Sequence, residues 1–341
     1  MKTVLVTGAA GFIGAAIARS LLSVGNKVVT IDNLTTGRIE NIPEGCIFIE
    51  GNDYDKKVIE QLNDYRFDSI IHIAGQSSGE VSFEDPIYDL QTNTQSTLML
   101  LDYAKSTGCK EFIFASSMST YGDHDNSFVS ESTPTVPKSF YAVGKLASEN
   151  YMRIYSRMYG IQCTALRFFN VYGIGQNMDN LKQGMASIYL ALALKEHHIT
   201  VKGTKDRFRD FVYIDDIVSA VIKSMSRKKG DMYEVYNVSN ACKTHVFEIV
   251  ELIEKSLPFN VTHQYVEGTP GDQMGVYGDN SKIIKDLDWT PKISFEEGVL
   301  LSVIGVDDFG VYNVVGSMLF YFLMLYLFQV HKHNLNTYEH Y

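Results

Sequence analysis

Short apolar segments alternate with helical patterns through the first half of the chain. Between the segments, apolar residues recur at helical spacing from Phe12 to Leu22 and again over residues 97–104. Five segments are expected to be buried strands: residues 3–6, 28–31, 46–49, 69–73 and 111–115. Because parallel strands need a crossover connection, this alternation predicts an α/β fold with a doubly wound parallel sheet.

A glycine-rich turn, residues 7–14, follows the first strand and opens the first helix. Gly8, Gly11 and Gly14 would let the backbone approach a pyrophosphate, which the N–H groups of Phe12, Ile13 and the rest of the helix N-terminus would attract. The same glycines could instead serve a helix cap or close packing.

Asp32 ends the second strand, where a carboxylate can accept hydrogen bonds from a ribose diol. A 2′-phosphate would meet a like charge there, so the sequence predicts NAD rather than NADP as the cofactor. Asn33 and Asn52 are further candidates for the adenosine, with solvated loop positions as the alternative.

Tyr141 and Lys145 are four residues apart, which places both on one face of a helix. A nearby ammonium lowers the pKa of a phenol and so favours its use as a general base. Ser117 follows a strand, at the sheet edge where ligands of open α/β sheets bind, and can hydrogen-bond a substrate hydroxyl.

The charge balance and the histidines exclude other classes of site. The chain has 40 acidic and 30 basic side chains, which argues against a nucleic-acid partner. His197 and His198 are adjacent and cannot share a helix face, and His72 on a strand is most simply a core residue, so no metal is expected.

The order of motifs resembles the extended short-chain dehydrogenase/reductases, in particular the NAD-dependent epimerase/dehydratase group with its Rossmann domain. The resemblance covers residues 1 to about 298. It rests on the glycine turn and on segments in the same order as in the family: residues 32–34, 72–75, 85–86 with Asn93, 116–117, 121–122, Tyr141 with Lys145, 167–173, 209–216, 236–238 and 270–272.

The resemblance implies a role for each matching residue. Tyr141 would be the catalytic base, Lys145 would bind the nicotinamide ribose, and Ser117 would hold the reacting sugar hydroxyl. Ala74 and Asn93 would lie beside the cofactor. Asn170, Arg209 and Asp272 match positions at the substrate, although Arg209 could instead pair with Asp206 or Asp210.

Four positions, in three segments of the chain, differ from residues found in other members of the family. Dehydratases of the family carry two acidic residues where this chain has Met118 and Ser119, so dehydration is disfavoured. Thr269 stands where a phosphate-binding Arg is often found. Val276 matches the residue that limits the sugar's bulk in the 4-epimerases, so an N-acetylated sugar could fit, unless Val276 is ordinary core.

Together these features predict an NAD-dependent epimerase that acts at C4 of a nucleotide sugar through a transient keto-sugar. The alternatives within enzymes are a nucleotide-sugar reductase and a C2 epimerase. The non-enzyme alternative is a nucleotide-binding scaffold or sensor with an inactive site, against which the intact set of Ser117, Tyr141 and Lys145 argues.

The expected domains are interleaved. Residues 1–170 would bind NAD with a returning segment at about 210–240, and residues 171–300 would form a smaller substrate-binding domain. A homodimer is expected through the helices at 97–105 and 141–157. Widely spaced cysteines and an N-terminus without a signal peptide predict a cytoplasmic enzyme.

Residues 301–341 do not follow the family pattern. The stretch 309–330 has no charged residue and is long enough to cross a bilayer, which takes about 20 apolar residues. Three interpretations stay open: a C-terminal membrane anchor, a buried core helix, or an aberrant terminus that replaces the family's usual last helix.

Overall fold

A computed structural model describes residues 1–305 except 123, 125–126, 180–183, 226, 229 and 269–273. Asp272 and the apolar stretch 309–330, both singled out from the sequence, lie outside the described residues. Within the described part, no helix is both long and apolar enough to span a bilayer.

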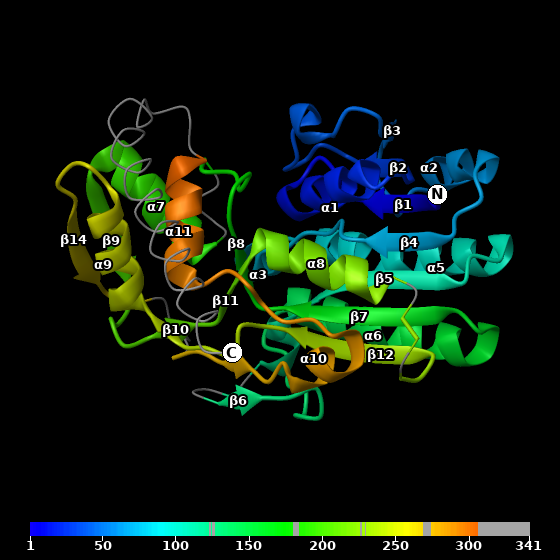
Figure 1. Cartoon of the computed structure of the whole chain (residues 1–341). Coiled ribbons are helices and arrows are strands. Elements are labelled where there is room, and N and C mark those ends of the chain that lie inside the picture. Colours follow the sequence, from blue (N-terminus) through cyan, green and yellow to red (C-terminus); the bar gives the residue numbers. More distant parts are fainter. Residues whose placement is uncertain are drawn as a thin grey trace, which may run out of the picture.

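Seven parallel strands form the central sheet, in the order β12-β7-β5-β4-β1-β2-β3 (Figure 1). The strand order reverses between β1 and β4, and this reversal opens a crevice at the carboxyl edge of the sheet. The strands are β1 (Thr3–Thr7), β2 (Lys27–Asp32), β3 (Ile47–Glu50), β4 (Ser69–His72), β5 (Glu111–Ser117), β7 (Gln162–Phe168) and β12 (Tyr233–Val238). The doubly wound sheet expected from the sequence is confirmed.

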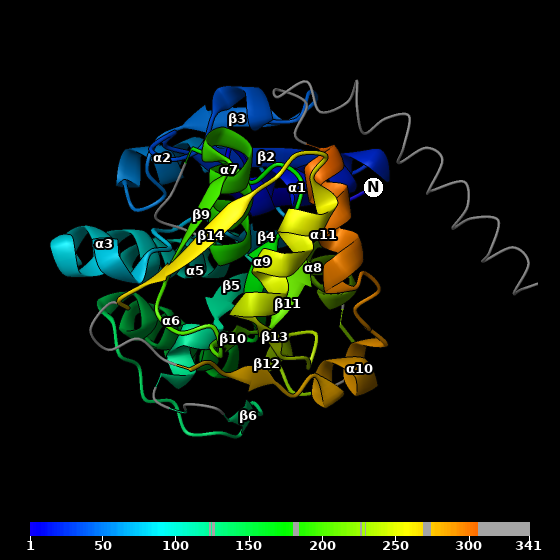
Figure 2. The same cartoon turned by 90° about the vertical axis from the view of Figure 1, so that its left-hand side faces the viewer.

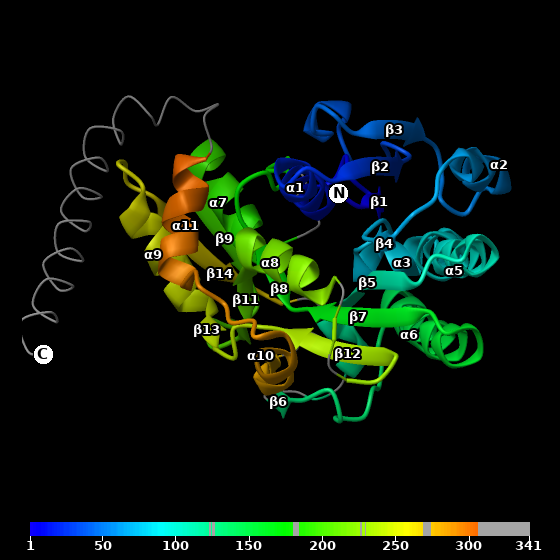
Figure 3. The same ribbon diagram turned by 45° about the vertical axis from the view of Figure 1, so that its right-hand side comes forward.

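Helices cover both faces of the sheet because strand side chains alternate between the two faces. On one face, α1 (Phe12–Ser23), α8 (Ile214–Ser224) and α10 (Ser281–Leu287) pack against the strands (Figure 3). On the other face lie α2 (Lys56–Glu60), α5 (Ser96–Thr107) and α6 (Phe140–Tyr159). The short helices α3 (Gly79–Glu84) and α4 (Pro86–Leu90) precede α5.

A second lobe with its own apolar core stands at the carboxyl edge of the sheet (Figure 2). Its helices are α7 (Met185–Glu196), α9 (Val246–Ser256) and α11 (Phe295–Ile304). Two-stranded pairs complete it: β8 (Asn170–Tyr172) with β11 (Phe211–Tyr213), β9 (His198–Lys202) with β14 (Thr262–Val266), and β10 (Phe208–Arg209) with β13 (Thr244–His245). A further pair joins β6 (Phe128–Val129) to β15 (Tyr277–Gly278) beneath the sheet.

One expected strand differs in extent from the structure. The apolar pattern predicts a strand over residues 210–215, whereas β11 ends at Tyr213 and α8 begins at Ile214. Asp216, in the first turn of α8, accepts backbone N–H groups of Lys292 and Ile293 at 2.9–3.0 Å. These contacts secure the start of the helix by tertiary bonds that a local pattern does not reveal.

Candidate active site

The glycine turn packs too closely for any larger residue. A Cβ atom at Gly14 would lie 2.1 Å from the carbonyl oxygen of Gly8, and Gly8 itself has φ of +77°. Helix α1 begins after Gly11, with no side chain capping its N-terminus among the described residues. The first N–H groups of α1 are therefore available to an anion, as a dinucleotide pyrophosphate requires.

Asp32 ties the turn to the loop that follows β2. Its carboxylate accepts the N–H of Ala10 at 2.9 Å and the N–H of Leu34 at 2.9 Å. Beyond it, the Asn33 amide donates to the Asn52 amide oxygen at 2.7 Å, which links two loops at the same sheet edge. A carboxylate oxygen has a second lone pair, so Asp32 can still accept from a ribose hydroxyl.

A cavity of about 640 Å³ follows the carboxyl edge of the sheet from the glycine turn to α6. Thirteen of the residues singled out from the sequence line it: Gly8, Gly11, Phe12, Ile13, Gly14, Asp32, Asn33, Asn52, Ala74, Ser117, Tyr141, Lys145 and Asn170. The structure thus gathers most of the predicted cofactor and catalytic residues in one space.

Helix α6 holds Tyr141 and Lys145 in its first two turns. The Ser139 hydroxyl caps the helix by accepting the N–H of Ala142 at 3.1 Å. The Lys145 ammonium lies 4.7 Å from the ring centre of Phe114 and 5.7 Å from that of Tyr141. The two residues therefore form a pair at the cavity wall, as their spacing predicted.

Burial sets the pKa values of this pair. Burial raises the pKa of Tyr141 to about 12, and a hydrogen bond with the Ser117 hydroxyl lowers this pKa by a smaller amount. Burial lowers the pKa of Lys145 to about 8, because the ammonium is almost fully removed from water. In the protein without cofactor, Tyr141 is thus a neutral phenol at neutral pH, and Lys145 can lose its charge within the accessible pH range.

The two serines at the end of β5 have different tasks. Ser116 donates to Glu149 at 2.6 Å, and Glu149 forms a buried ion pair with Arg167 at 2.7 Å. Ser117 lines the cavity, and its hydroxyl accepts the N–H of Ser119 at 3.2 Å. The Ser117 hydroxyl also hydrogen-bonds Tyr141, which favours the phenolate, so the two groups lie together at the cavity wall.

Asn93 lies behind the cavity wall. Its side-chain amide donates to the carbonyl oxygen of Gln76 at 2.9 Å and to Asp89 at 3.1 Å. The Asn93 oxygen is buried and has no hydrogen-bond partner among the described residues. Sequence reasoning missed Gln76 and Asp89, because nothing in a polar stretch shows which of its side chains will be buried.

The substrate end departs most from the sequence-based expectations. Asn170 lines the cavity and donates to the carbonyl oxygen of Asp210 at 3.0 Å. Arg209 donates to the carbonyl oxygens of Phe208 and Met274, and it is not part of the cavity wall as described. The Asp210 carboxylate accepts backbone N–H groups of Asn240 and Gly278.

Val276 is buried in the main apolar core, at 3% exposure, beside the sheet. It too is absent from the cavity wall that the structure describes. The interpretation of Val276 as ordinary core therefore fits the structure better than a role in limiting the size of the sugar.

The buried histidine of β4 also has a structural role. His72 shares hydrogen bonds with Thr7 at 2.8 Å and Ser96 at 3.3 Å. Burial lowers its pKa to about 3, so it is neutral at physiological pH.

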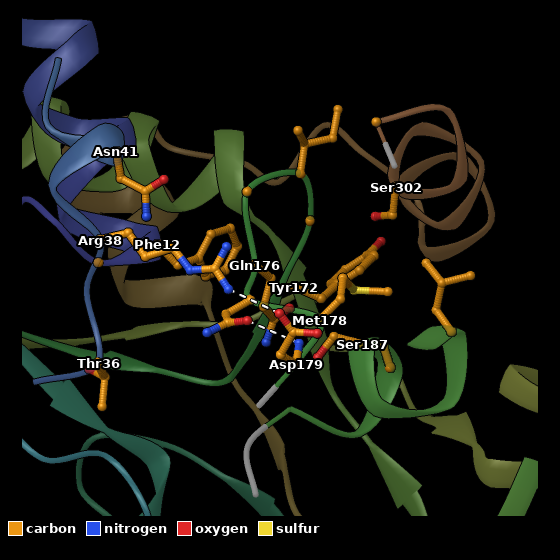
Figure 4. A pocket seen from close by; sticks show the side chains of 18 of the residues that line it. Phe12, Thr36, Arg38, Asn41, Tyr172, Gln176, Met178, Asp179, Ser187 and Ser302 are labelled. Atoms are coloured by element: carbon orange, nitrogen blue, oxygen red, sulfur yellow. Dashed lines mark hydrogen bonds and ion pairs between the residues drawn. The ribbon is translucent and has the colours of Figure 1, made fainter. Parts of the chain in front are cut away.

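A second cavity, of about 340 Å³, adjoins the glycine turn between the two lobes (Figure 4). Across it, Arg38 pairs with Asp179 at 2.9 Å, and Lys195 of α7 reaches the other oxygen of Asp179 at 2.6 Å. These residues join the loop after β2 to the second lobe. No motif in the sequence predicted this link.

Comparison with known proteins assigns the chain to a family. The model of the NAD dependent epimerase/dehydratase family matches residues 4–239. The chain belongs to the NAD-dependent epimerase/dehydratase family. A putative UDP-glucose 4-epimerase of Methanocaldococcus jannaschii is 32% identical over 297 residues, which cover 87% of this chain and 95% of that protein.

Solved structures of epimerases share the fold of this family member. UDP-glucose 4-epimerase of Thermotoga maritima with UDP-glucose superimposes with a TM-score of 0.85 at 32% identity, over 89% of this chain and 98% of that one. UDP-N-acetylglucosamine 4-epimerase of Methanobrevibacter ruminantium, in complex with UDP-N-acetylmuramic acid, gives 0.83 at 29% identity, over 89% and 97%.

The chain is accordingly an NAD-dependent epimerase, and the cavity fits its cofactor. The first N–H groups of α1 carry no side-chain cap among the described residues and border the cavity, where they could hold the pyrophosphate, and Asp32 offers an acceptor for the adenosine ribose. Tyr141 and Lys145 line the far part of the same cavity, where the nicotinamide ribose would be held.

Proposed function

We propose that this epimerase inverts C4 of a UDP-activated hexose, such as UDP-glucose or UDP-galactose or an N-acetylated equivalent. The observation that carries the proposal is that Ser117, Tyr141 and Lys145 line one cavity together with the cofactor residues. The similar proteins are named as UDP-sugar 4-epimerases, which supports UDP as the nucleotide and C4 as the position of inversion.

The chain's own residues move a proton and orient the sugar. Tyr141 takes the proton of the C4 hydroxyl, and Ser117 hydrogen-bonds the same oxygen while it becomes a carbonyl. Bound NAD supplies reversible hydride transfer. Lys145 favours the Tyr141 phenolate through its positive charge, and Tyr141 returns the proton after the keto-sugar has turned over in the site.

Substrate binding divides between Asn170, which lines the cavity, and residues at the edge of the second lobe. Asn170 lies where a substrate diphosphate would approach the sheet edge, and its amide is fixed by the carbonyl of Asp210. The sequence pattern around Arg209 and Asp272 assigns both to the substrate. We retain Arg209 as a candidate whose guanidinium must turn from the Phe208 carbonyl to reach a phosphate.

A panel of nucleotide sugars tests the proposal. Purified protein without added NAD is incubated with UDP-glucose, UDP-galactose, UDP-N-acetylglucosamine and UDP-N-acetylgalactosamine, and the products are identified by NMR. We expect at least one C4 pair to reach equilibrium, with NAD retained on the protein. Inversion at C2, or stoichiometric release of oxidised or reduced cofactor, would contradict the proposal.

We further propose that the enzyme is a homodimer through α6. Three apolar side chains on this helix, Val143, Ile154 and Met158, are more than half exposed, and Phe83 and Ile87 on the neighbouring α3 and α4 extend the apolar surface. Burying such a surface is favourable. Light scattering should give a dimer for the wild type and a monomer for Ile154→Asp; a monomeric wild type would contradict the proposal.

The cytoplasm is the proposed compartment, because all four cysteines are free and two of them are buried. Cell fractionation tests this location. Recovery of the full chain in the membrane fraction, reversed by removal of residues 309–341, would instead support an anchor in that stretch.

A further inference from the structure

Asp89 is a buried carboxylate to which the roles described so far give no task. It lies on α4 and is 1% exposed. It accepts hydrogen bonds from the side-chain amides of Gln76 at 2.8 Å and Asn93 at 3.1 Å. Gln76 lines the main cavity, so Asp89 lies directly behind the cavity wall.

The backbone shows how close this carboxylate comes to the catalytic pair. A Cβ atom on Gly144, the residue before Lys145, would lie 3.5 Å from a carboxylate oxygen of Asp89. A Cβ atom on Gly75 would lie 2.5 Å from the Asn93 oxygen and 3.4 Å from the Lys145 nitrogen. Asp89 therefore holds the Asn93 amide on the same side of Gly75 as the Lys145 ammonium, and it lies directly beneath the backbone of α6 at Gly144.

Four titratable groups face Lys145, each from a different element. Asp89 belongs to α4, Asp53 follows β3, His72 belongs to β4 and Tyr141 belongs to α6. Burial lowers the pKa of Lys145, and attraction of its ammonium to Asp89 and Asp53 partly offsets that lowering. His72 contributes no charge at neutral pH, since burial lowers its pKa to about 3.

Asp89 is better placed than Asp53 to remain ionised. Burial raises the pKa of Asp89, and two amide donors together with the Lys145 charge counter that effect by favouring the carboxylate. One oxygen of Asp53 is buried and has no hydrogen-bond partner among the described residues, and burial raises the pKa of Asp53 to about 7. Near neutral pH, Asp53 is thus partly protonated, and Asp89 is the steadier negative charge beside Lys145.

We propose that Asp89 is a positioning residue for epimerisation, which fixes the Asn93 amide and keeps the Lys145 ammonium charged beside Tyr141. The part of this inference that concerns catalysis rests on the proposed function. The part that concerns Lys145 can be measured without turnover.

The test compares three variants of Asp89. Asp89→Asn and Asp89→Ser remove the charge but keep a hydrogen-bonding group, and Asp89→Glu keeps the charge. Lysines are labelled with carbon-13 at Cε, the Lys145 signal is assigned with Lys145→Arg, and its titration is followed by NMR. In both neutral variants, Lys145 should lose its proton at a lower pH than in wild type, by about one pH unit.

The pH profile of kcat/KM provides the second readout. Removing a negative charge lowers the pKa of both Lys145 and Tyr141, since Asp89 raises both. The acidic and the alkaline limbs should therefore both move to lower pH in Asp89→Asn, and Asp89→Glu should restore the wild-type profile. A purely structural role would lower kcat without moving the limbs.

Asp216→Asn is the matched control, because Asp216 is also buried and accepts backbone N–H groups, but is not among the residues that line the cavity. It should lower stability and leave the Lys145 titration unchanged. An unshifted Lys145 in the neutral Asp89 variants, or failure of both to fold, would overturn the proposal. An inactive wild type in which Lys145 still responds to Asp89 would count against the proposed function alone.

Discussion

At the residue scale, Tyr141 has to lose its phenolic proton before it can act as the general base. Without cofactor, burial raises its pKa to about 12, so the phenolate that a general base requires is scarce at neutral pH. A positive charge near the ring favours the phenolate; the Lys145 ammonium, 5.7 Å from the ring centre of Tyr141, would provide one, and the nicotinamide of NAD would provide another when bound. The protein therefore becomes competent for proton abstraction when the cofactor is in place.

The variant Tyr141→Phe tests this role. Turnover should fall by about 10² to 10⁴-fold, because a positioned general base contributes about that factor. The variant should still fold and retain NAD, since only the hydroxyl is removed. Initial rates and the NAD content of the purified protein provide the measurement.

Tyr155→Phe is the control for the tyrosine variant. Tyr155 lies on the same helix and packs against Tyr159, outside the cavity. It should keep wild-type rates. Substantial activity in Tyr141→Phe would remove Tyr141 as the base.

The buried charge of Lys145 serves the site but lowers the stability of the cofactor-free protein. Its pKa in the folded protein, about 8, is below the ordinary 10.5, so the unfolded chain binds more protons between these values. Stability therefore rises with pH over that window, and at pH 7 the buried charge is a cost. Lys145→Met should raise the free energy of unfolding of the cofactor-free protein at pH 7 by up to about 3 kcal/mol, because the pKa is lowered by about 2.5 units and one unit corresponds to about 1.4 kcal/mol.

Urea unfolding at pH 7 and pH 10 measures this effect. The gain from Lys145→Met should shrink at pH 10, where the wild-type lysine is already neutral, and turnover should be lost at both values. If the variant is less stable than wild type at pH 7, the account is wrong: Asp53 and Asp89 then offset the whole free-energy cost of burying the ammonium.

At the scale of elements, the site depends on how α6 is fixed to the sheet. Glu149 of α6 forms two hydrogen bonds with Arg167 of β7 at 2.7 and 2.9 Å and accepts from Ser116 of β5. All three side chains are buried. This connection sets the height of α6 above the strand end that carries Ser117, and so the place of Tyr141.

Glu149→Gln should therefore destabilise the protein by about 3 kcal/mol or more, because it leaves the Arg167 charge buried and uncompensated. Asp179→Asn is the control, since Asp179 pairs with Arg38 and Lys195 at the surface, where water screens ion pairs and they add little to stability. Denaturant unfolding measures both. If both variants lower the free energy of unfolding by the same small amount, burial does not make the Glu149–Arg167 pair more costly to break than a surface pair.

The arrangement of strands and helices explains which site residues could be predicted from the sequence and which could not. Gly8, Asp32, Asn52 and Ser117 were predictable because each lies at the end of a parallel strand or within two residues after it, and parallel strands bring their carboxyl ends to one edge. Tyr141 and Lys145 followed from helical spacing.

The rest depends on contacts between distant segments. Arg209 turns to the carbonyls of Phe208 and Met274, and Val276 packs into the core, because the loops of the second lobe decide both orientations. Asp89 is buried by contacts with Gln76 and α6, which a local polar pattern does not reveal. The domain boundaries placed from sequence near residues 170 and 300 stay a prediction.

At the scale of the whole molecule, the two lobes divide the work. The sheet lobe supplies the cofactor turn, Ser117 and the Tyr141–Lys145 pair, and the second lobe closes the carboxyl edge beside Asn170 (Figure 1). The Arg38–Asp179–Lys195 link joins the lobes next to the glycine turn (Figure 4). A cavity lined by both lobes can hold a keto-sugar while it turns over, which epimerisation requires and net oxidation does not.

The most direct test follows one hydrogen atom. UDP-galactose carrying deuterium at C4 is incubated with the protein without added NAD, and the position of the label in the product is read by NMR. If hydride leaves and returns within one closed site, UDP-glucose will form with the deuterium still on C4. Loss of the deuterium to solvent, or a product that has gained or lost hydride overall, would contradict the proposed function.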